Sequence, residues 1–189
     1  KLKTNWGIFD YSACFISKVD SGENVVGGDF AGELFGWGVR GEGNRTYPQN
    51  STPYFEWILG TDYTFNEGIY FNAEYYHNGA GRNDPNQYDW AGFFNGQTIF
   101  KANQYSYLLV RKEINELMNV SLAGVNNLDD GSLIVYPLWA YNAYENIDLS
   151  MGALFMLGAS GTEFKPNSTQ DPTGYIGNNI YFLKYRYSF

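Results

Sequence analysis

The feature that most constrains this chain is a strict alternation of apolar and polar residues in two adjacent segments, 54–65 and 69–78. In the first segment the odd positions are almost all apolar, and the even positions carry the charges. The apolar members are Phe55, Trp57, Leu59, Tyr63 and Phe65, and the opposite parity holds Glu56, Gly60, Asp62 and Thr64. Period-two alternation on both sides of a short Asn-Glu-Gly turn predicts a β-hairpin with one apolar and one polar face.

Similar alternation recurs along the whole chain, and helical periodicity is weak throughout. It predicts about nine strands, at residues 6–19, 28–43, 53–65, 69–78, 104–113, 118–127, 132–143, 147–158 and 178–189. Long loops are expected at 44–52, 79–103 and 159–177, in a single domain that covers 1–189. Within 28–43 the apolar parity changes, which predicts a β-bulge near Gly36, and Pro137 predicts a bulge or a local break in its strand.

Composition narrows the class of protein. Aromatic residues make up 19% of the chain and charged residues only 17%, against about 25% charged in an ordinary soluble domain. The chain has 12 basic and 20 acidic residues, a net charge of −8, which argues against nucleic-acid binding because that needs a basic surface. Cys14 is the single cysteine and His77 the single histidine, so we expect no internal disulfide, no bound metal and no cofactor.

A transmembrane helix would need about 18 consecutive apolar residues, and the best run here, 151–159, is too short. A mean hydropathy of −0.38 would normally indicate a soluble protein. Transmembrane β-barrels are the exception, because their strands alternate lipid-facing and lumen-facing residues and so average to a polar value. Strands of about ten residues, joined alternately by short turns and long loops, are typical of that class.

The last residues of the chain carry aromatic or apolar side chains at every second position. These are Tyr181, Leu183, Tyr185, Tyr187 and Phe189, the final residue. In this pattern the chain resembles bacterial outer-membrane β-barrel proteins of the porin kind, although the glycine often found in their terminal signal is absent. The resemblance implies the outer membrane of a Gram-negative bacterium, contact with its lipid, and insertion by the barrel assembly machinery, with Tyr185, Tyr187 and Phe189 as the insertion signal.

The expected fold is therefore all-β, an antiparallel transmembrane β-barrel. A count of nine strands conflicts with the even number found in single-chain bacterial barrels. Either one strand is miscounted, or the chain is the C-terminal portion of a larger barrel. Both interpretations stand at this point.

The polar parity of the predicted strands supplies candidate residues for lining a lumen or pore. They are Arg40, Glu42, Glu56, Asp62, Asn72, Glu74, Lys184 and Arg186. The hairpin turn makes Asp62 and Glu74 diagonal neighbours, with Asp62 opposite Asn72. The set fits an acidic, water-filled lumen that favours cations, as carboxylate rings do in channels. It fits equally a narrow barrel plugged by charge pairs, in which the basic residues, Lys112 included, neutralise the carboxylates.

Other features carry weaker chemical hypotheses. His77, at the end of a strand, fits an aromatic belt better than a catalytic role, and Cys14 has no evident base to activate it. Paired carboxylates of the glycosidase type have no fixed spacing here, and a calcium site in loop 79–103 lacks EF-hand spacing. That loop is rich in aromatic residues and should fold inward or against a partner, where it can constrict a pore, bind a sugar or touch another subunit. We expect no enzymatic activity.

The expected function is passive passage of small hydrophilic solutes or ions through a porin-like channel, with loop 79–103 as its constriction. One alternative is a narrow plugged barrel with a structural or surface-interaction role, because about eight to ten strands leave room only for side chains. Another is a soluble ligand-binding barrel with its apolar faces inward and Glu56, Asp62 and Glu74 outside. Homo- and hetero-oligomers both stay open.

Overall fold

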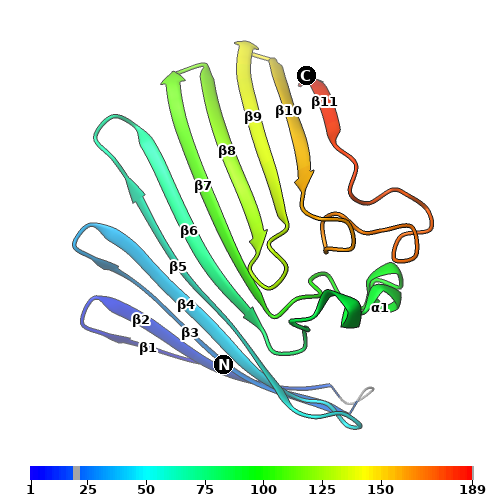
Figure 1. Cartoon of the computed structure of the whole chain (residues 1–189). Coiled ribbons are helices and arrows are strands. Elements are labelled where there is room, and N and C mark those ends of the chain that lie inside the picture. Colours follow the sequence, from blue (N-terminus) through cyan, green and yellow to red (C-terminus); the bar gives the residue numbers. More distant parts are fainter. Residues whose placement is uncertain (19–21, 189) are drawn as a thin grey trace.

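A computed structural model describes residues 1–18 and 22–188. In this part of the chain, eleven strands form one antiparallel sheet in which each strand pairs with the next along the sequence (Figure 1). The strands are β1 (Leu2–Trp6), β2 (Phe9–Lys18), β3 (Glu23–Leu34), β4 (Trp37–Tyr47), β5 (Tyr54–Thr64), β6 (Ile69–Asn78), β7 (Gln104–Asn115), β8 (Met118–Asn127), β9 (Leu133–Tyr144), β10 (Ile147–Leu157) and β11 (Ile180–Tyr187). A 3₁₀ turn η1 (Pro85–Gln87) and a short helix α1 (Trp90–Phe94) lie between β6 and β7. The all-β, antiparallel prediction is therefore confirmed.

The connections are sorted by length between the two ends of the sheet. At one end, here the turn end, strands are joined by the short turns 7–8, 35–36, 65–68, 116–117 and 145–146. At the other, the loop end, lie the connections 48–53, 79–103, 128–132 and 158–179, together with the one between β2 and β3. Figure 1 shows the turn end at the top and left and α1 with the long loops at the bottom and right. The alternation of short and long links expected from the sequence is present, although the first long loop starts at 48 rather than 44.

The strand count is corrected from nine to eleven. The segment predicted as one strand at 28–43 is two, β3 and β4, and the expected β-bulge near Gly36 is a hairpin turn. Phe35 and Gly36 both have positive φ, 54° and 82°, as a two-residue turn between twisted antiparallel strands requires. The turn itself accounts for the change of apolar parity, because Leu34 pairs with Trp37 directly across it. The short first strand, β1, was not predicted.

Pro137 interrupts the sheet on one side only. It pairs with Leu122 of β8, while the ladder between β9 and β10 has a gap between the pairs Leu138–Gly152 and Val135–Phe155. Proline has no backbone N–H to donate, so it removes one hydrogen bond from the side it faces. The predicted local break is thus confirmed as a gap in pairing within a continuous strand.

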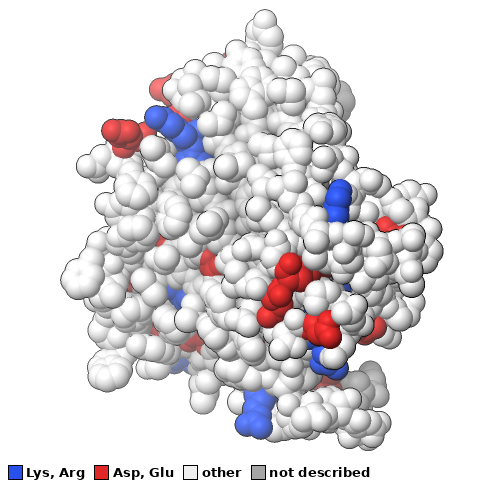
Figure 2. Space-filling model, viewed as in Figure 1, with Lys and Arg blue, Asp and Glu red and all other residues white. Residues whose placement is uncertain are grey.

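The register places nearly all charges of the strands on one face of the sheet. We call the face that carries Arg40, Asp62 and Glu74 the polar face, and the opposite one the apolar face. Cross-strand pairs such as Leu59–Tyr75, Phe71–Val110 and Met151–Trp139 define the apolar face. Among the described strand residues, its Lys and Arg side chains are Arg45 near the loop end and Lys112 near the turn end. Figure 2 shows that the surface on the side in view is mostly uncharged, with acidic and basic groups scattered over it.

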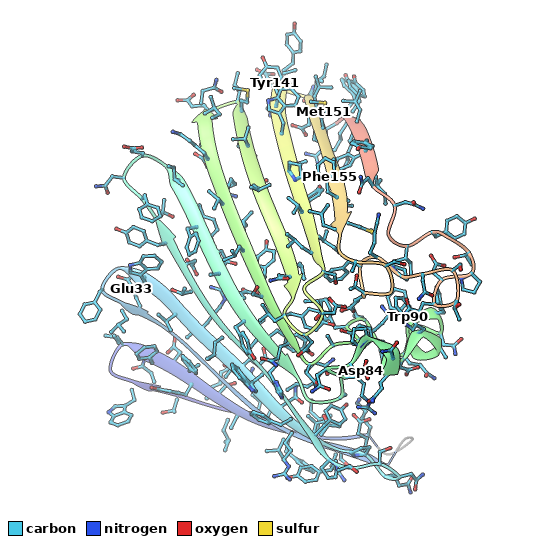
Figure 3. All side chains as sticks on the ribbon, viewed as in Figure 1. Glu33, Asp84, Trp90, Tyr141, Met151 and Phe155 are labelled. Atoms are coloured by element: carbon cyan, nitrogen blue, oxygen red, sulfur yellow. The ribbon has the colours of Figure 1, made fainter. Side chains whose placement is uncertain are left out.

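The apolar face is bare. Its large side chains are exposed along the middle of the strands, with Leu108 at 52%, Met151 at 55% and Leu183 at 76%. Met151 and Phe155 can be followed along β10 in Figure 3. The buried residues gather instead where the loops pack on the polar face at the loop end, in a cluster of Tyr88, Ala102, Tyr105 and Phe164.

The sheet is curved but not closed within the described residues. β1 and β11 each have one neighbour, β2 and β10, and Figure 1 shows the two edges far apart. Both edge strands run from the loop end to the turn end, because an odd number of antiparallel strands begins and ends in the same direction. None of the helices formed by residues 1–18 and 22–188 is long and apolar enough to cross a membrane.

Candidate functional site

All eight residues predicted to line a lumen lie on the polar face. The hairpin register is the expected one, since Asp62 pairs with Asn72 and Gly60 with Glu74. The structure divides the eight into two groups. Arg40, Glu42, Glu56, Asp62, Asn72 and Glu74 lie on β4 to β6, and Lys184 and Arg186 lie on β11 at the far edge of the sheet.

Arg40 holds two carboxylates at once. Its Nη1 lies 2.5 Å from Oδ1 of Asp62 and its Nη2 lies 2.6 Å from Oε1 of Glu74. Gly60 lies between them, and a Cβ there would come within 3.1 Å of both Arg40 Nε and Glu74 Cγ. The absent side chain therefore opens the space in which the guanidinium crosses β5. One cation for two carboxylates leaves this group with a net negative charge.

The remaining acidic candidates on this part of the wall are not held by a cation in the described residues. Glu56 accepts a hydrogen bond of 2.8 Å from the Tyr76 hydroxyl, and Glu42 is exposed. Asn72 is buried and donates to the carbonyl of Thr61 at 3.4 Å. The polar face of β4 to β6 is thus acidic as well as polar.

The hypothesis of a full charge network across the lumen is only partly matched. Arg186 binds Asp148 on the neighbouring strand, with Nε 2.8 Å from the carboxylate oxygen Oδ2. Lys112, expected to help neutralise the carboxylates, lies on the apolar face opposite Ile69. The basic side chains of β11 are separated from the acidic wall of β4 to β6 by the width of the sheet.

A cavity of about 760 Å³ lies between the polar face and loop 79–103. The sheet contributes Glu56, Glu74 and Tyr76, and the loop contributes Arg82, Asp89 and Phe100. Asp89 also caps α1, accepting the backbone N–H of Gly92 at 2.8 Å. The Tyr76 and Phe100 rings are tilted against each other with centroids 5.8 Å apart. The cavity therefore combines carboxylates with an aromatic wall.

A buried polar network that the sequence did not predict anchors the loops to the sheet. Its centre is Glu163, 2% exposed, from the connection between β10 and β11. The carboxylate accepts hydrogen bonds from Tyr105 Oη at 2.6 Å, Asn127 Nδ2 at 2.8 Å and the Lys101 backbone N–H at 3.0 Å. Lys101 Nζ lies 3.7 Å from the same carboxylate. Two long loops are thus joined to β7 and β8 through one side chain.

The buried pair of Lys101 and Glu163 also shifts proton affinities. Burial raises the pKa of the Glu163 carboxyl and lowers the pKa of the Lys101 ammonium, because water no longer solvates either charge. The ammonium finds a second partner in the rings of α1, with Nζ 3.5 Å from the centroid of Phe93 and 4.3 Å from that of Trp90. The contact packs α1 against Lys101, which Glu163 in turn links to Tyr105 and Asn127 of the sheet, so part of the aromatic loop folds inward, as expected. Phe94 and Ile99 nevertheless stay exposed.

The C-terminal signal residues and His77 fall on the apolar face. Tyr185 pairs with Leu149, and Tyr187 with Ile147, while Phe189 lies outside the described residues. His77 stacks on Trp57 at 5.9 Å between ring centroids, which is the packing expected of a member of an aromatic belt. Cys14 lies on the polar face and pairs with Gly27.

The geometry brings together an acidic wall, a loop folded over it, and a cavity with aromatic and charged groups. Lys184 and Arg186 lie outside the cavity, and Glu163 and Lys101 stabilise the loop that forms it. The buried network was missed because its members are scattered along the sequence, Lys101 and Glu163 being 62 residues apart. In sequence comparisons the chain matches no protein-family model and no curated protein.

Proposed function

We propose that this chain forms part or all of the wall of a transmembrane β-barrel in a bacterial outer membrane, and that it allows small hydrophilic solutes or ions to pass. The observation that carries the proposal is the bare apolar face of an eleven-stranded sheet whose charges face the other way. Soluble proteins rarely expose apolar patches of more than a few hundred Å². Exposure of this face is unfavourable in water, whereas in a bilayer the same face would be the surface that contacts lipid.

Side chains along the apolar face support a bilayer as the environment. Aromatic residues cluster near the turn end, where Trp37 stacks on Tyr63 at 4.8 Å between centroids. Others cluster near the loop end, where Trp57 lies 5.0 Å from Tyr75. Between them the strands present aliphatic residues such as Leu108 and Leu122. Two aromatic belts around an aliphatic band are typical of outer-membrane barrels.

The lengths of strands and loops support the same environment. The strands from β2 to β10 have ten to twelve residues each, and about 9–11 tilted residues cross a bilayer. Short turns gather at one end and long loops at the other, as in outer-membrane barrels with periplasmic turns and external loops. The turn end would then face the periplasm.

Closure of the barrel depends on how the two edge strands, β1 and β11, are paired. Unpaired backbone groups are costly in lipid, so β1 and β11 must both find partners there. Because these two strands run in the same direction, an all-antiparallel closure needs an odd number of additional strands between them. A direct pair of β1 with β11 would be the single parallel contact in the wall.

In this proposal, loop 79–103 controls the passage of solutes. It folds against the polar face and is fixed there by Glu163 and the ring contacts of Lys101, so it would narrow the lumen at the loop end. If it fills the lumen completely, the barrel is the plugged, structural alternative.

Conductance across a planar bilayer tests the proposal. The chain, reconstituted into lipid with its insertion checked by tryptophan quenching from brominated lipid, should give discrete steps and a reversal potential favouring cations. Arg82 and Ala102 pair at the base of the loop, so residues 83–99 can be replaced by a short Gly-Ser linker, which should raise the step size. Protein that stays in solution without detergent would overturn the membrane assignment. Insertion without steps, in the wild type and the linker variant alike, would leave the structural role.

A further inference from the structure

We propose that the cavity under loop 79–103 binds an organic cation, a small molecule with an ammonium group on an apolar or aromatic body. The inference rests on the proposed function only for the route by which such a ligand arrives. The cavity itself is formed by the sheet and the loop. Its volume of about 760 Å³ lies within the range of roughly 300–1,000 Å³ that small-molecule sites occupy.

The charges around the cavity are not balanced. Glu56 and Asp89 have no ion-pair partner in the described part of the chain, and Glu74 shares Arg40 with Asp62. Arg82 is the opposing positive group, and its Nη1 donates to the backbone carbonyls of Ala80 and Gly81. Lys101 does not add to it, because Glu163 offsets its charge. An excess of negative charge remains, which a cationic ligand would neutralise.

The position of the aromatic rings specifies an ammonium attached to an apolar group rather than a hydrated metal ion. The Tyr76 hydroxyl donates to Glu56 at 2.8 Å, so the tyrosine ring lies beside a carboxylate that has no cationic partner in the described residues. Phe100 packs against that ring and lines the same cavity. A cation next to Glu56 would be neutralised by the carboxylate, and its apolar body would cover the aromatic wall formed by Tyr76 and Phe100.

The chain already uses this arrangement on itself. Lys101 Nζ lies over the rings of Trp90 and Phe93 and within 3.7 Å of the Glu163 carboxylate. The cavity repeats the combination of ring and carboxylate with Tyr76, Phe100 and Glu56. Lys101 also lines it, but its ammonium group is already engaged by Glu163 and the rings of α1 and forms no ion pair with Glu56. A neutral sugar would use the aromatic wall but leave the carboxylates uncompensated.

Calorimetric titration of the whole chain in detergent, with 2-phenylethylammonium chloride as probe, tests the inference. 2-Phenylethanol and 3-phenylpropionate serve as the neutral and anionic probes of matched shape. We expect measurable binding of the ammonium probe, at least about tenfold weaker binding of the alcohol, and none of the anion. Equal binding of ammonium and alcohol, or failure of the ammonium probe to bind, would overturn the inference.

Variants locate the site. E56Q keeps an acceptor for Tyr76 and removes one charge, so it should weaken binding about tenfold, whereas E42Q removes the same charge from the same face outside the cavity and should leave binding within about twofold. F100L keeps an apolar side chain but no ring and should cost about two- to fivefold. If E56Q and E42Q behave alike, the cavity is not the site.

The result is independent of passage through the membrane, because binding is measured without a bilayer. If the protein conducts but does not bind the ammonium probe, the proposed site is rejected and the proposed channel stands. Binding in a protein that gives no conductance would support the site and reject the channel.

Discussion

Arg40 and Glu74 belong to strands that do not pair with each other, yet their side chains meet across the strand between them. Nη2 of Arg40 lies 2.6 Å from Oε1 of Glu74, and the guanidinium passes over Gly60 of β5, which pairs with both residues. The contact depends on a residue that contributes no atom to it. The absence of a side chain at Gly60 thus allows one guanidinium to link three strands of the polar face.

Substituting Gly60 should break this coupling. G60V would place methyl groups where Arg40 Nε and Glu74 Cγ already lie within 3.1 Å of a Cβ position. We expect a loss of about 1–3 kcal/mol in the free energy of unfolding, typical of overpacking. Unfolding by urea from lipid vesicles measures it. G124V is the control, because a Cβ at Gly124 meets nothing closer than 3.4 Å. Equal effects of the two variants would contradict the role assigned to Gly60.

Removing the guanidinium should make the acidic wall more negative. In R40Q the carboxylates of Asp62 and Glu74 lose their shared cation, so the reversal potential in a salt gradient should move further toward cation selectivity. R45Q removes the same charge from the apolar face near the loop end and should change selectivity far less. An unchanged potential in R40Q, or a shift toward anions, would show that this group does not line the ion path.

The buried pair that anchors the loops should be far more sensitive to losing one partner than to losing both. K101M leaves the Glu163 carboxylate buried without its cation, and E163Q leaves the buried Lys101 ammonium without its carboxylate. Breaking a buried pair in this way typically costs about 3–5 kcal/mol. Hydrogen exchange of the loop amides in K101M, E163Q and the double variant measures the local stability. A double variant as unstable as the sum of the single ones would mean that the two charges do not interact.

Two adjacent leucines test which face meets lipid. Leu108 lies on the apolar face opposite Ala73, and Leu109 lies on the polar face opposite Asn72. L108R should cost about 2–4 kcal/mol in folding free energy in a bilayer, the cost of a basic residue near the midplane. L109R should cost much less, because its side chain would enter the lumen. If L108R is the milder change in lipid vesicles, the faces are assigned the wrong way round.

An element of the fold could be predicted from the sequence where local contacts determine its structure. The hairpin of β5 and β6 was predicted with its register, because alternation and a glycine turn specify both within 25 residues. The turn at Phe35 and Gly36 was missed because an aromatic residue rarely adopts positive φ, so a parity change looked like a bulge. β1 was missed because it is five residues long and only Leu2 and Trp6 in it are large and apolar.

The polar face could be predicted and the cavity could not. Parity alone assigned Glu56, Asp62 and Glu74 to one face, since it needs no knowledge of the loops. The cavity exists because loop 79–103 folds back over that face, and it does so through Glu163, a single carboxylate in an unrelated loop. Nothing near Glu163 in sequence distinguishes it from an exposed residue. Contacts of this kind form only when strand pairing has brought the loops at the loop end close together, so the sequence alone does not reveal them.

The shared direction of β1 and β11 also limits how copies of this chain can assemble. Two copies inserted in the same orientation, edge to edge, would meet as β11 against β1 at both contacts, and both would be parallel in a wall that is otherwise antiparallel. An antiparallel contact between identical edges needs one copy to be inverted across the bilayer, which would put long loops on both sides. In the proposed barrel, the strand parity would therefore disfavour self-association of this sheet through its two edges.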